Sequence, residues 1–308
     1  MIEISKTLYE KYKSIMPDPE TFIEISNQPL PFCFWVNTNR TKLNSVESFL
    51  EARKIQAKKL QWNNEAFEIN GKVNLGNTSI YVLGHIHIQE AVSMVPGYIA
   101  NLLKPKTVLD MCAAPGNKAA QIGVNQSSNS LLIANEPFMG RHSSLRSNLN
   151  RLGVSSVIYT KYDGASFPIL ESPVDLVMCD VPCSCEGTLR KSKTIKLNEA
   201  YSQKLAQTQL GILKRALRNT KVGGHVIYST CTFNPVENEG VIQRLIESEP
   251  KGKFSIVETG IPNLFTSPGL TSWQNTKFDK QISKTMRLWP QQNNSGGFYV
   301  AVLEKNSD

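Results

Sequence analysis

The chain has 308 residues and 40% of them are hydrophobic, which is enough for one large domain or two smaller ones with a true core. No apolar run approaches the roughly 20 residues of a membrane span, so we expect no membrane insertion. The formal net charge of +8 is consistent with an anionic partner, although it fits a merely basic soluble protein equally well. The N-terminus MIEISKTLYEKYK is charged and amphipathic, unlike a signal peptide. We therefore expect an intracellular monomer, in the nucleus or the cytoplasm.

The first 88 residues predict a small α+β unit. Ser45 is a candidate N-cap, followed by early glutamates and late lysines as in an ordinary helix. An Asn-Gly pair interrupts the last strand-like segment. The expected elements are a helix at 5–15, a strand at 29–40, a helix at 45–60 and a strand at 65–73 that is broken by an Asn-Gly turn.

Residues 89–308 predict a second domain with a different rhythm. After a helix at 90–103, interrupted near Pro96, short apolar strands alternate with helices, which indicates a mostly parallel sheet covered on both faces. Residues 259–280 are expected to form a long loop, and 286–290 and 298–304 a terminal antiparallel hairpin. The parallel strands are expected at 107–112, 131–136, 156–163, 175–182 and 225–233, and the main helices from 117, at 141–153 and at 202–220.

The first of these parallel strands runs into a sharp corner, DMCAAPGNK, between Asp110 and Lys118. Small side chains in such a turn allow a ligand to approach the backbone, and a helix is expected to start directly after it. The corner contains neither a G-x-G-x-x-G fingerprint nor a P-loop. A purely structural turn remains an alternative at this point.

Two acids follow the next two strands. Glu136 ends the second strand, where a carboxylate suits ribose hydroxyls, and Asp163 ends the third, where it suits an adenine amino group. A single acid in such a place is often only a helix cap. Together with Asp110, the two acids predict a nucleoside pocket.

Cysteines mark the following strand ends. Cys183 lies in DVPCSCEGT with Asp180, and Cys231 lies in YSTCTFNPVENE. Because neighbouring strands lie about 4.8 Å apart, both thiols are expected to reach one cavity beside the nucleoside pocket. Buried, inert cysteines are the alternative, but they favour apolar neighbours.

We predict no metal site. Without a signal peptide, cysteines are more often buried or catalytic than paired in disulfides. The C-x-C spacing of Cys183 and Cys185 is too short for the usual zinc C-x-x-C knuckle. His85 and His87 alternate on a strand-like segment and are interpreted as surface or turn residues. The six cysteines are Cys33, Cys112, Cys179, Cys183, Cys185 and Cys231.

The three motifs together resemble the signature stretches of the Nol1/Nop2/Sun family of RNA (cytosine-5) methyltransferases, over roughly Pro29 to the C-terminus. QEAVSMVP and GTLRK are most similar to the eukaryotic tRNA methyltransferase branch. The chain departs from the family pattern at Asn117, where Gly or Ser is usual, at Glu136, where Asp is common, and at Cys185, where Gly is usual. The resemblance implies a Rossmann-like, S-adenosylmethionine-dependent methyltransferase sheet with a small N-terminal RNA-facing unit.

The resemblance also implies roles for single residues. Cys231 is the expected nucleophile toward cytosine C6, and Cys183 is expected to release the product. Asp180 is expected to hydrogen-bond the base, with Lys118 between the base and the methionine end of the cofactor. The expected cofactor-binding residues are Cys112, Ala113, Ala114, Pro115, Gly116, Asn117, Lys118, Glu136, Arg141, Asp163 and Asp180.

Three other functions compete with 5-methylcytosine formation in tRNA. They are methylation of rRNA cytosine, a non-catalytic RNA-binding scaffold, and amino-methylation, which commonly uses [DN]-P-P-[YF] where this chain has Asp180-Val-Pro-Cys183. DNA cytosine methyltransferases attack through a Pro-Cys motif, but the presence of both thiols favours the RNA type.

Basic side chains cluster in three groups that we interpret as RNA-facing, with a solvated surface as the alternative. The third group follows Cys183 closely and is expected to border the catalytic cleft. The groups are Arg53, Lys54, Lys58 and Lys59; Arg141, Arg146 and Arg151; and Arg190, Lys191, Lys193 and Lys196.

Overall fold

The computed structural model describes every residue except 1, 70, 72, 128, 193–194 and 196. Its larger sheet has the strand order β11-β14-β15-β9-β8-β5-β6-β7, with β10 paired to β15. The parallel strands are β5 (Thr107–Asp110), β6 (Leu131–Asn135), β7 (Val157–Thr160), β8 (Val174–Asp180) and β9 (Thr220–Thr230). The antiparallel strands are β10 (Phe254–Val257), β11 (Ser267–Pro268), β14 (Met286–Leu288) and β15 (Phe298–Lys305). The predicted α/β class, the parallel sheet and the terminal hairpin are confirmed.

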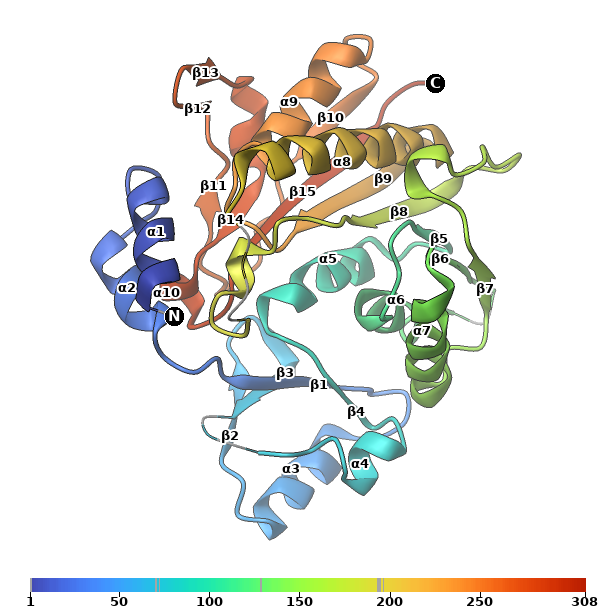
Figure 1. Cartoon of the computed structure of the whole chain (residues 1–308). Helices are drawn as coiled ribbons and strands as arrows, with labels where there is room; N and C mark the ends of the chain where they lie inside the picture. The colour runs from blue at the N-terminus through green and yellow to red at the C-terminus, as the bar shows by residue number, and fades with distance from the viewer. Residues whose placement is uncertain (1, 70, 72, 128, 193–194, 196) are drawn as a thin grey trace.

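Helices cover both faces of this sheet because alternate strand residues point to opposite sides. Val108 packs in one core with α5, α6 and α7, and Leu109 packs in the other with α8 and α9. Figure 1 shows α8 and α9 on one side of the sheet and α5, α6 and α7 on the other. The helices are α5 (Val95–Leu103), α6 (Asn117–Gly123), α7 (Met139–Leu152), α8 (Glu199–Asn219) and α9 (Glu239–Ser248).

A smaller antiparallel sheet, drawn in blue at the bottom of Figure 1, has the order β2-β3-β1-β4. The prediction of one helix at 45–60 is wrong. The helix ends at Ala52 and Lys54 turns with φ 55°, so that residues 57–60 can pair with β3. The elements are β1 (Phe32–Val36), α3 (Leu43–Ala52), β2 (Ala57–Leu60), β3 (Asn63–Ile69), α4 (Ser79–Val82) and β4 (Ile86–Ile88).

Ser45 does not cap that helix, because α3 already begins at Leu43 after Lys42. Pro96 does not interrupt a helix either. A short 3₁₀ turn, η1 (Val92–Met94), precedes it, and Pro96 stands in the first turn of α5, where its missing N–H costs no hydrogen bond.

The N-terminal helices α1 (Ile2–Tyr12) and α2 (Pro19–Ser26) pack on the segments that follow β8 and β9 of the larger sheet. The ring of Phe22 meets that of Phe233 edge-on at 5.8 Å, and the Tyr12 hydroxyl donates to Glu186 Oε2 at 2.8 Å. The division between residues 88 and 89 stays a prediction. The remaining elements are η2 (Gly164–Ser166), η3 (Glu186–Thr188), β12 (Ser272–Trp273), β13 (Thr276–Lys277), η4 (Lys280–Lys284) and α10 (Pro290–Asn293).

Among the described residues, no helix combines the length and the apolar character that crossing a bilayer requires.

Candidate active site

A cavity of about 770 Å³ opens at the carboxyl ends of the central parallel strands, the edge where such sheets bind ligands. Its volume is in the ordinary range for small-molecule sites. Its lining includes Cys112, Ala114, Pro115, Asn117, Lys118, Glu136, Arg141, Asp163, Asp180, Cys183, Cys185 and Cys231. The structure therefore brings together the acids and the thiols that the sequence placed at successive strand ends.

The corner after β5 is stabilised by the acid that ends the strand. Asp110 is buried, and its Oδ1 accepts the Cys112 N–H at 3.1 Å. Burial raises the pKa of Asp110 to about 7. Gly116 turns with φ 107°, a conformation that side-chain-bearing residues rarely adopt, and α6 begins at the next residue. Asp110 thus stabilises the turn from inside the protein. Ala113 is also buried within the turn.

Asn135, which the sequence analysis did not single out, links three strand ends. Its Nδ2 donates to the carbonyls of Met111 and Tyr162 at 3.0 and 2.8 Å. Its Oδ1 accepts from the Thr160 hydroxyl and the Tyr162 N–H, each at 2.9 Å. The side chain is fully buried, so these bonds fix the ends of β5, β6 and β7. The sequence contains a hint of this role, because a polar residue at the end of an otherwise apolar strand, directly before Glu136, needs hydrogen-bond partners.

Glu136 lies directly after β6, and its carboxylate is held by the protein. Oε1 accepts the Phe138 N–H at 3.0 Å, and Oε2 accepts Arg141 Nη1 at 2.9 Å. Arg141 also donates to the Ala114 carbonyl at 2.6 Å, which ties α7 to the corner. Asp163 follows β7, and its Oδ1 caps η2 through the Ala165 N–H at 2.8 Å. Both acids line the cavity, as predicted.

His87 connects the small sheet to the corner. Its Nε2 lies 3.0 Å from Asn117 Oδ1, and its Nδ1 accepts from Arg151 Nη2 at 2.7 Å. Burial and, to a smaller extent, the Arg151 charge lower the pKa of His87 to about 4 although its hydrogen bond with Asn117 opposes the shift, so the ring is neutral near pH 7. His87 is therefore a buried structural residue, unlike the surface histidine that we expected. Asn117, the departure from the family pattern, supplies the acceptor.

An ion pair between a buried lysine and a half-buried carboxylate separates the corner from the thiols. Lys118 Nζ contacts Asp180 Oδ2 at 2.6 Å, and Ser229 donates to Asp180 Oδ1 at 2.8 Å. Lys118 also lies 5.1 Å from the centre of the Phe298 ring, which packs against its cation. These contacts fix the Asp180 carboxylate at the end of β8, between cofactor corner and thiols.

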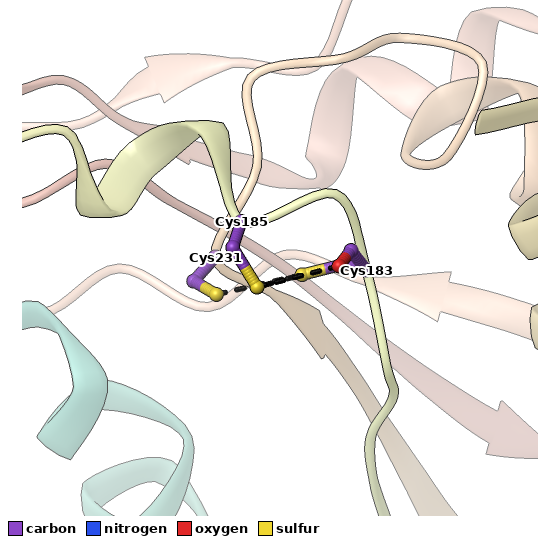
Figure 2. Close-up of side chains that lie close together, drawn as sticks. All are labelled: Cys183, Cys185 and Cys231. Atoms are coloured by element: carbon purple, nitrogen blue, oxygen red, sulfur yellow. Dashed lines mark hydrogen bonds between the residues drawn. The ribbon is translucent and has the colours of Figure 1, made fainter. Parts of the chain in front are cut away.

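Three thiols meet at the ends of β8 and β9. Figure 2 shows their sulfur atoms pointing toward one another. Cys183 Sγ lies 3.4 Å from Cys231 Sγ and 3.9 Å from Cys185 Sγ. The prediction that Cys183 and Cys231 reach one cavity is confirmed. Cys185 is a third thiol in this cavity, which we did not predict.

The contacts among the three thiols shift the pKa of each of them. Hydrogen bonds from Cys183 and Cys231 lower the pKa of Cys185 to about 3. The pKa of Cys183 is raised well above the usual range by its bonds to Cys185 and Cys231 and by burial. Although its bond with Cys183 lowers the pKa of Cys231, Cys185, burial and Asp180 together raise it above the usual range. Cys185, the most exposed of the three residues, is the one whose pKa is lowered, and its Sγ also lies 3.3 Å from the Cys183 carbonyl oxygen.

The backbone explains why glycine is usual at position 185. Cys185 has φ 58° and ψ 25°, in the left-handed region, which costs a residue with a side chain on the order of 1 kcal/mol. The chain accepts this strain and gains a thiol directed at Cys183.

Two buried glutamates hold the loop that carries the thiols, and the sequence analysis assigned neither a role. Glu237 Oε2 accepts the Ser184 N–H at 2.9 Å and Gln209 Nε2 at 3.0 Å. Glu186 Oε2 accepts from Thr232 at 3.1 Å and from Tyr12 at 2.8 Å. The stretch NPVENE after Cys231 could have indicated a role for Glu237. The Glu186 contact could not be predicted, because its partner Tyr12 lies on a helix remote in sequence.

The interpretation of the basic groups as RNA-facing needs correction at two arginines, Arg190 of the predicted cleft border and Arg151 of the second group. Arg190 is buried and donates to the carbonyls of Gln28, Pro29 and Ser295 and to Asn294 Oδ1. Arg151 donates to the carbonyls of Tyr81 and Ile86, besides its bond to His87. Both guanidinium groups serve the fold. Lys191 is exposed, and Lys193 and Lys196 lie outside the described residues.

The remaining basic residues are at the surface. Arg146 stacks over the Tyr159 ring at 4.9 Å and Arg53 over Phe49 at 3.6 Å. Lys58 and Lys59 pair with Glu68 and Glu47. Exposed pairs of this kind are weak enough to yield to a phosphate.

Comparison with known proteins decides the family. The model of the family described as "16S rRNA methyltransferase RsmB/F" matches residues 98–304, two thirds of the chain. The chain belongs to the RsmB/F family. The resemblance to Nol1/Nop2/Sun RNA (cytosine-5) methyltransferases is thereby confirmed.

Relatives in the RsmB/F family differ in length. The chain is 34% identical to a tRNA (cytosine(49)-C(5))-methyltransferase of Pyrococcus abyssi, over 98% of this chain and 97% of that protein. It is 30% identical to a 28S rRNA (cytosine-C(5))-methyltransferase of Mus musculus, over 98% of this chain but only 39% of the mouse protein. The crystal structure of a methyltransferase homolog from Pyrococcus horikoshii superposes with a TM-score of 0.82 at 28% identity, covering 98% of this chain and 95% of the other.

Proposed function

We propose that the chain forms 5-methylcytosine in tRNA, with S-adenosylmethionine, the cofactor of the RsmB/F family, as methyl donor. The observation that carries the proposal is the 3.4 Å separation of Cys183 and Cys231 in one cavity with the Lys118–Asp180 pair. A scaffold that only bound RNA would not need two thiols in contact beside a buried lysine paired with a half-buried carboxylate.

The lining residues fit the cofactor. Glu136 and Asp163 offer carboxylate oxygens at the ends of β6 and β7, and ribose hydroxyls and an adenine amino group are the donors that such acceptors prefer. Arg141 and the Phe138 N–H hold Glu136 in place, and each of its oxygens keeps a second lone pair for a ligand. We assign cofactor binding to the cavity-lining residues Cys112, Ala114, Pro115, Asn117, Lys118, Glu136, Arg141, Asp163 and Asp180. Ala113 and Gly116, which are buried, shape the corner.

The proposed chemistry begins with sulfur. The Cys231 thiolate adds to C6 of the cytosine, which makes C5 nucleophilic, because cytosine C5 by itself is a poor nucleophile. Asp180 hydrogen-bonds N3 and the amino group and stabilises the charge that develops on the ring. S-adenosylmethionine supplies the electrophilic methyl group for C5. Loss of the C5 proton then expels the Cys231 sulfur from C6, and Cys183 assists this release.

Before it attacks, Cys231 has to lose its proton. Cys183 contacts both other sulfurs, and Cys185 is the thiol of the three whose pKa is lowered. Passing the proton of Cys231 to Cys185 through Cys183 takes two transfers, and it is uphill because the pKa of Cys231 is raised. The target cytosine has to leave its stack to reach this buried position.

The choice of tRNA rests on sequence similarity. The chain is 34% identical to the tRNA-modifying relative from Pyrococcus abyssi and 30% identical to the mouse rRNA relative. Exposed lysines and arginines, among them Lys191 and Arg146, are suited to phosphate contacts, which position RNA without reading its sequence.

Bisulfite sequencing tests the proposal. Unmodified total tRNA and rRNA are incubated with the chain and S-adenosylmethionine, with the Cys231→Ala variant as control. We expect protected cytosines in tRNA only, and none with the variant. Protection confined to rRNA would show that rRNA, and not tRNA, is the substrate. RNA binding without any protected cytosine would favour a non-catalytic RNA-binding scaffold.

A further inference from the structure

We propose that Cys183, Cys185 and Cys231 form a binding site for a thiophilic metal ion such as Zn²⁺. The site goes beyond methyl transfer, and only its effect on the reaction rests on the proposed function. The argument uses sulfur positions, backbone conformation and access.

The sulfur atoms already have the spacing of metal ligands. All three Sγ atoms lie within 4.8 Å of one another, with two separations at 3.4 and 3.9 Å. Around a tetrahedral zinc ion with Zn–S bonds near 2.3 Å, sulfurs lie about 3.8 Å apart. Side-chain shifts of a few tenths of an ångström would therefore bring these three thiols to an ion.

Cys185 is the residue that makes the set complete. Two cysteines separated by one residue are a poor zinc pair, and the prediction of no metal site rested on that spacing. Cys231 joins them from the next strand, 46 residues beyond Cys185 in the sequence. At φ 58° the backbone suits glycine, yet it carries a thiol aimed at Cys183.

The surroundings select a soft ion and let it enter. Three thiols favour Zn²⁺ or Cu⁺ over Mg²⁺ and Ca²⁺, which take oxygen ligands. Cys185 is exposed and all three cysteines line the open cavity. An ion entering from solvent would displace the thiol protons and keep one coordination position for water.

Occupancy would stop the reaction. Cys231, which attacks the base, and Cys183, which assists its release, would both be ligands, so a filled site cannot bond to C6. The metal would act as a reversible brake, and an enzyme with glycine at position 185 would lack the third ligand.

Cobalt serves as the probe, because thiolate ligands give Co²⁺ an intense charge-transfer absorption. The full chain, reduced with a phosphine and freed of metal, is titrated with Co²⁺ and then with Zn²⁺. Cys185→Gly and Cys185→Ser remove the third thiol, and the control Cys33→Ala removes a buried cysteine of the small sheet. Circular dichroism verifies that each variant is folded.

We expect the wild type and Cys33→Ala to bind one ion per chain, with Zn²⁺ displacing Co²⁺. Both Cys185 variants should bind at least about 100-fold more weakly, because even the loss of an outer-shell partner costs 10–100-fold. Absence of the absorption in the wild type, unchanged affinity in a folded Cys185 variant, or its loss in Cys33→Ala would overturn the site.

A second measurement tests the brake. RNA adduct formation by the wild type should cease at Zn²⁺ concentrations that fill the site and return on chelation. An adduct that forms with the site filled would overturn the brake. The cobalt titration contains no RNA, so its result stands whether or not the proposed function is correct.

Discussion

The two halves of the active-site cavity are built differently. On the cofactor side, at the ends of β5, β6 and β7, the polar groups already have protein partners. Asp110 accepts the Cys112 N–H, Glu136 is held by Arg141, and Asn135 joins three strand ends. On the thiol side, at the ends of β8 and β9, the sulfurs of Cys183 and Cys231 contact each other.

The difference follows from what each side has to do. A binding site is tighter when its groups are already oriented, because ordering them then costs nothing on association. A covalent nucleophile has to lose a proton, form a bond and break it again, so its neighbours have to exchange protons. Substitutions on the cofactor side should therefore change affinity, and substitutions on the thiol side should change the reaction itself.

The largest effect is expected at the two thiols. Cys231→Ala should lower methylation by on the order of 10³-fold or more and form no RNA adduct, because the attacking group is gone. Cys183→Ala should still attack and transfer methyl, then stall with RNA attached. A denaturing gel with labelled RNA and S-adenosylmethionine distinguishes the variants by a shifted band for Cys183→Ala alone.

The reverse band pattern would assign the attack to Cys183. Methylation by Cys231→Ala at the wild-type rate would exclude the covalent mechanism. The proposed difference between the cofactor side and the thiol side of the cavity would then also be wrong.

The next effect is expected at Glu136. Glu136→Ala should weaken S-adenosylmethionine binding by about 1–3 kcal/mol, the usual cost of leaving polar ligand groups unpaired. Methylation at saturating cofactor should change little. Calorimetry measures the affinity, with exposed Glu171→Ala as control. Unchanged affinity would refute the ribose assignment.

The third prediction concerns the contact between the small sheet and the corner. The pKa of His87 is about 4 in the fold and near 6.5 in an unfolded chain, so unfolding takes up a proton between these values. Its contribution to stability is complete above pH 6.5 and decreases as the pH falls toward 4. From pH 7.5 to 5 the free energy of unfolding should fall by about 2 kcal/mol on this account.

Urea denaturation at the two pH values provides the measurement. His87→Gln, which cannot titrate, should show the smaller decrease. Equal decreases in the variant and the wild type would show that other groups govern acid stability.

The smallest effect is expected at Cys185. In metal-free protein, Cys185→Gly should raise the free energy of unfolding by roughly 0.5–1 kcal/mol, because glycine adopts φ 58° without a Cβ clash although it loses more entropy on folding. Urea denaturation measures the change. A loss of stability would mean that the thiol contacts outweigh the backbone strain, so that the thiol side is more firmly held than we infer.

The sequence by itself determined the alternation of strands and helices, the α/β class and the strand ends that carry Asp110, Glu136, Asp180 and Cys231. These features are local. An apolar stretch of strand length followed by an acid or a cysteine is visible in ten residues, and parallel strands bring their carboxyl ends to one edge whatever their order.

Only the tertiary structure decided which charges face solvent and which support the fold. Arg190 belongs to a basic run, yet its partners Gln28 and Ser295 come from opposite ends of the chain. Residues 57–60 continue a helical pattern but become β2, because the chain turns at Lys54 and pairing with β3 buries Leu60. Cys185 joins the cluster through a left-handed turn. Burial and hydrogen-bond partners depend on segments remote in sequence, and no local pattern contains them.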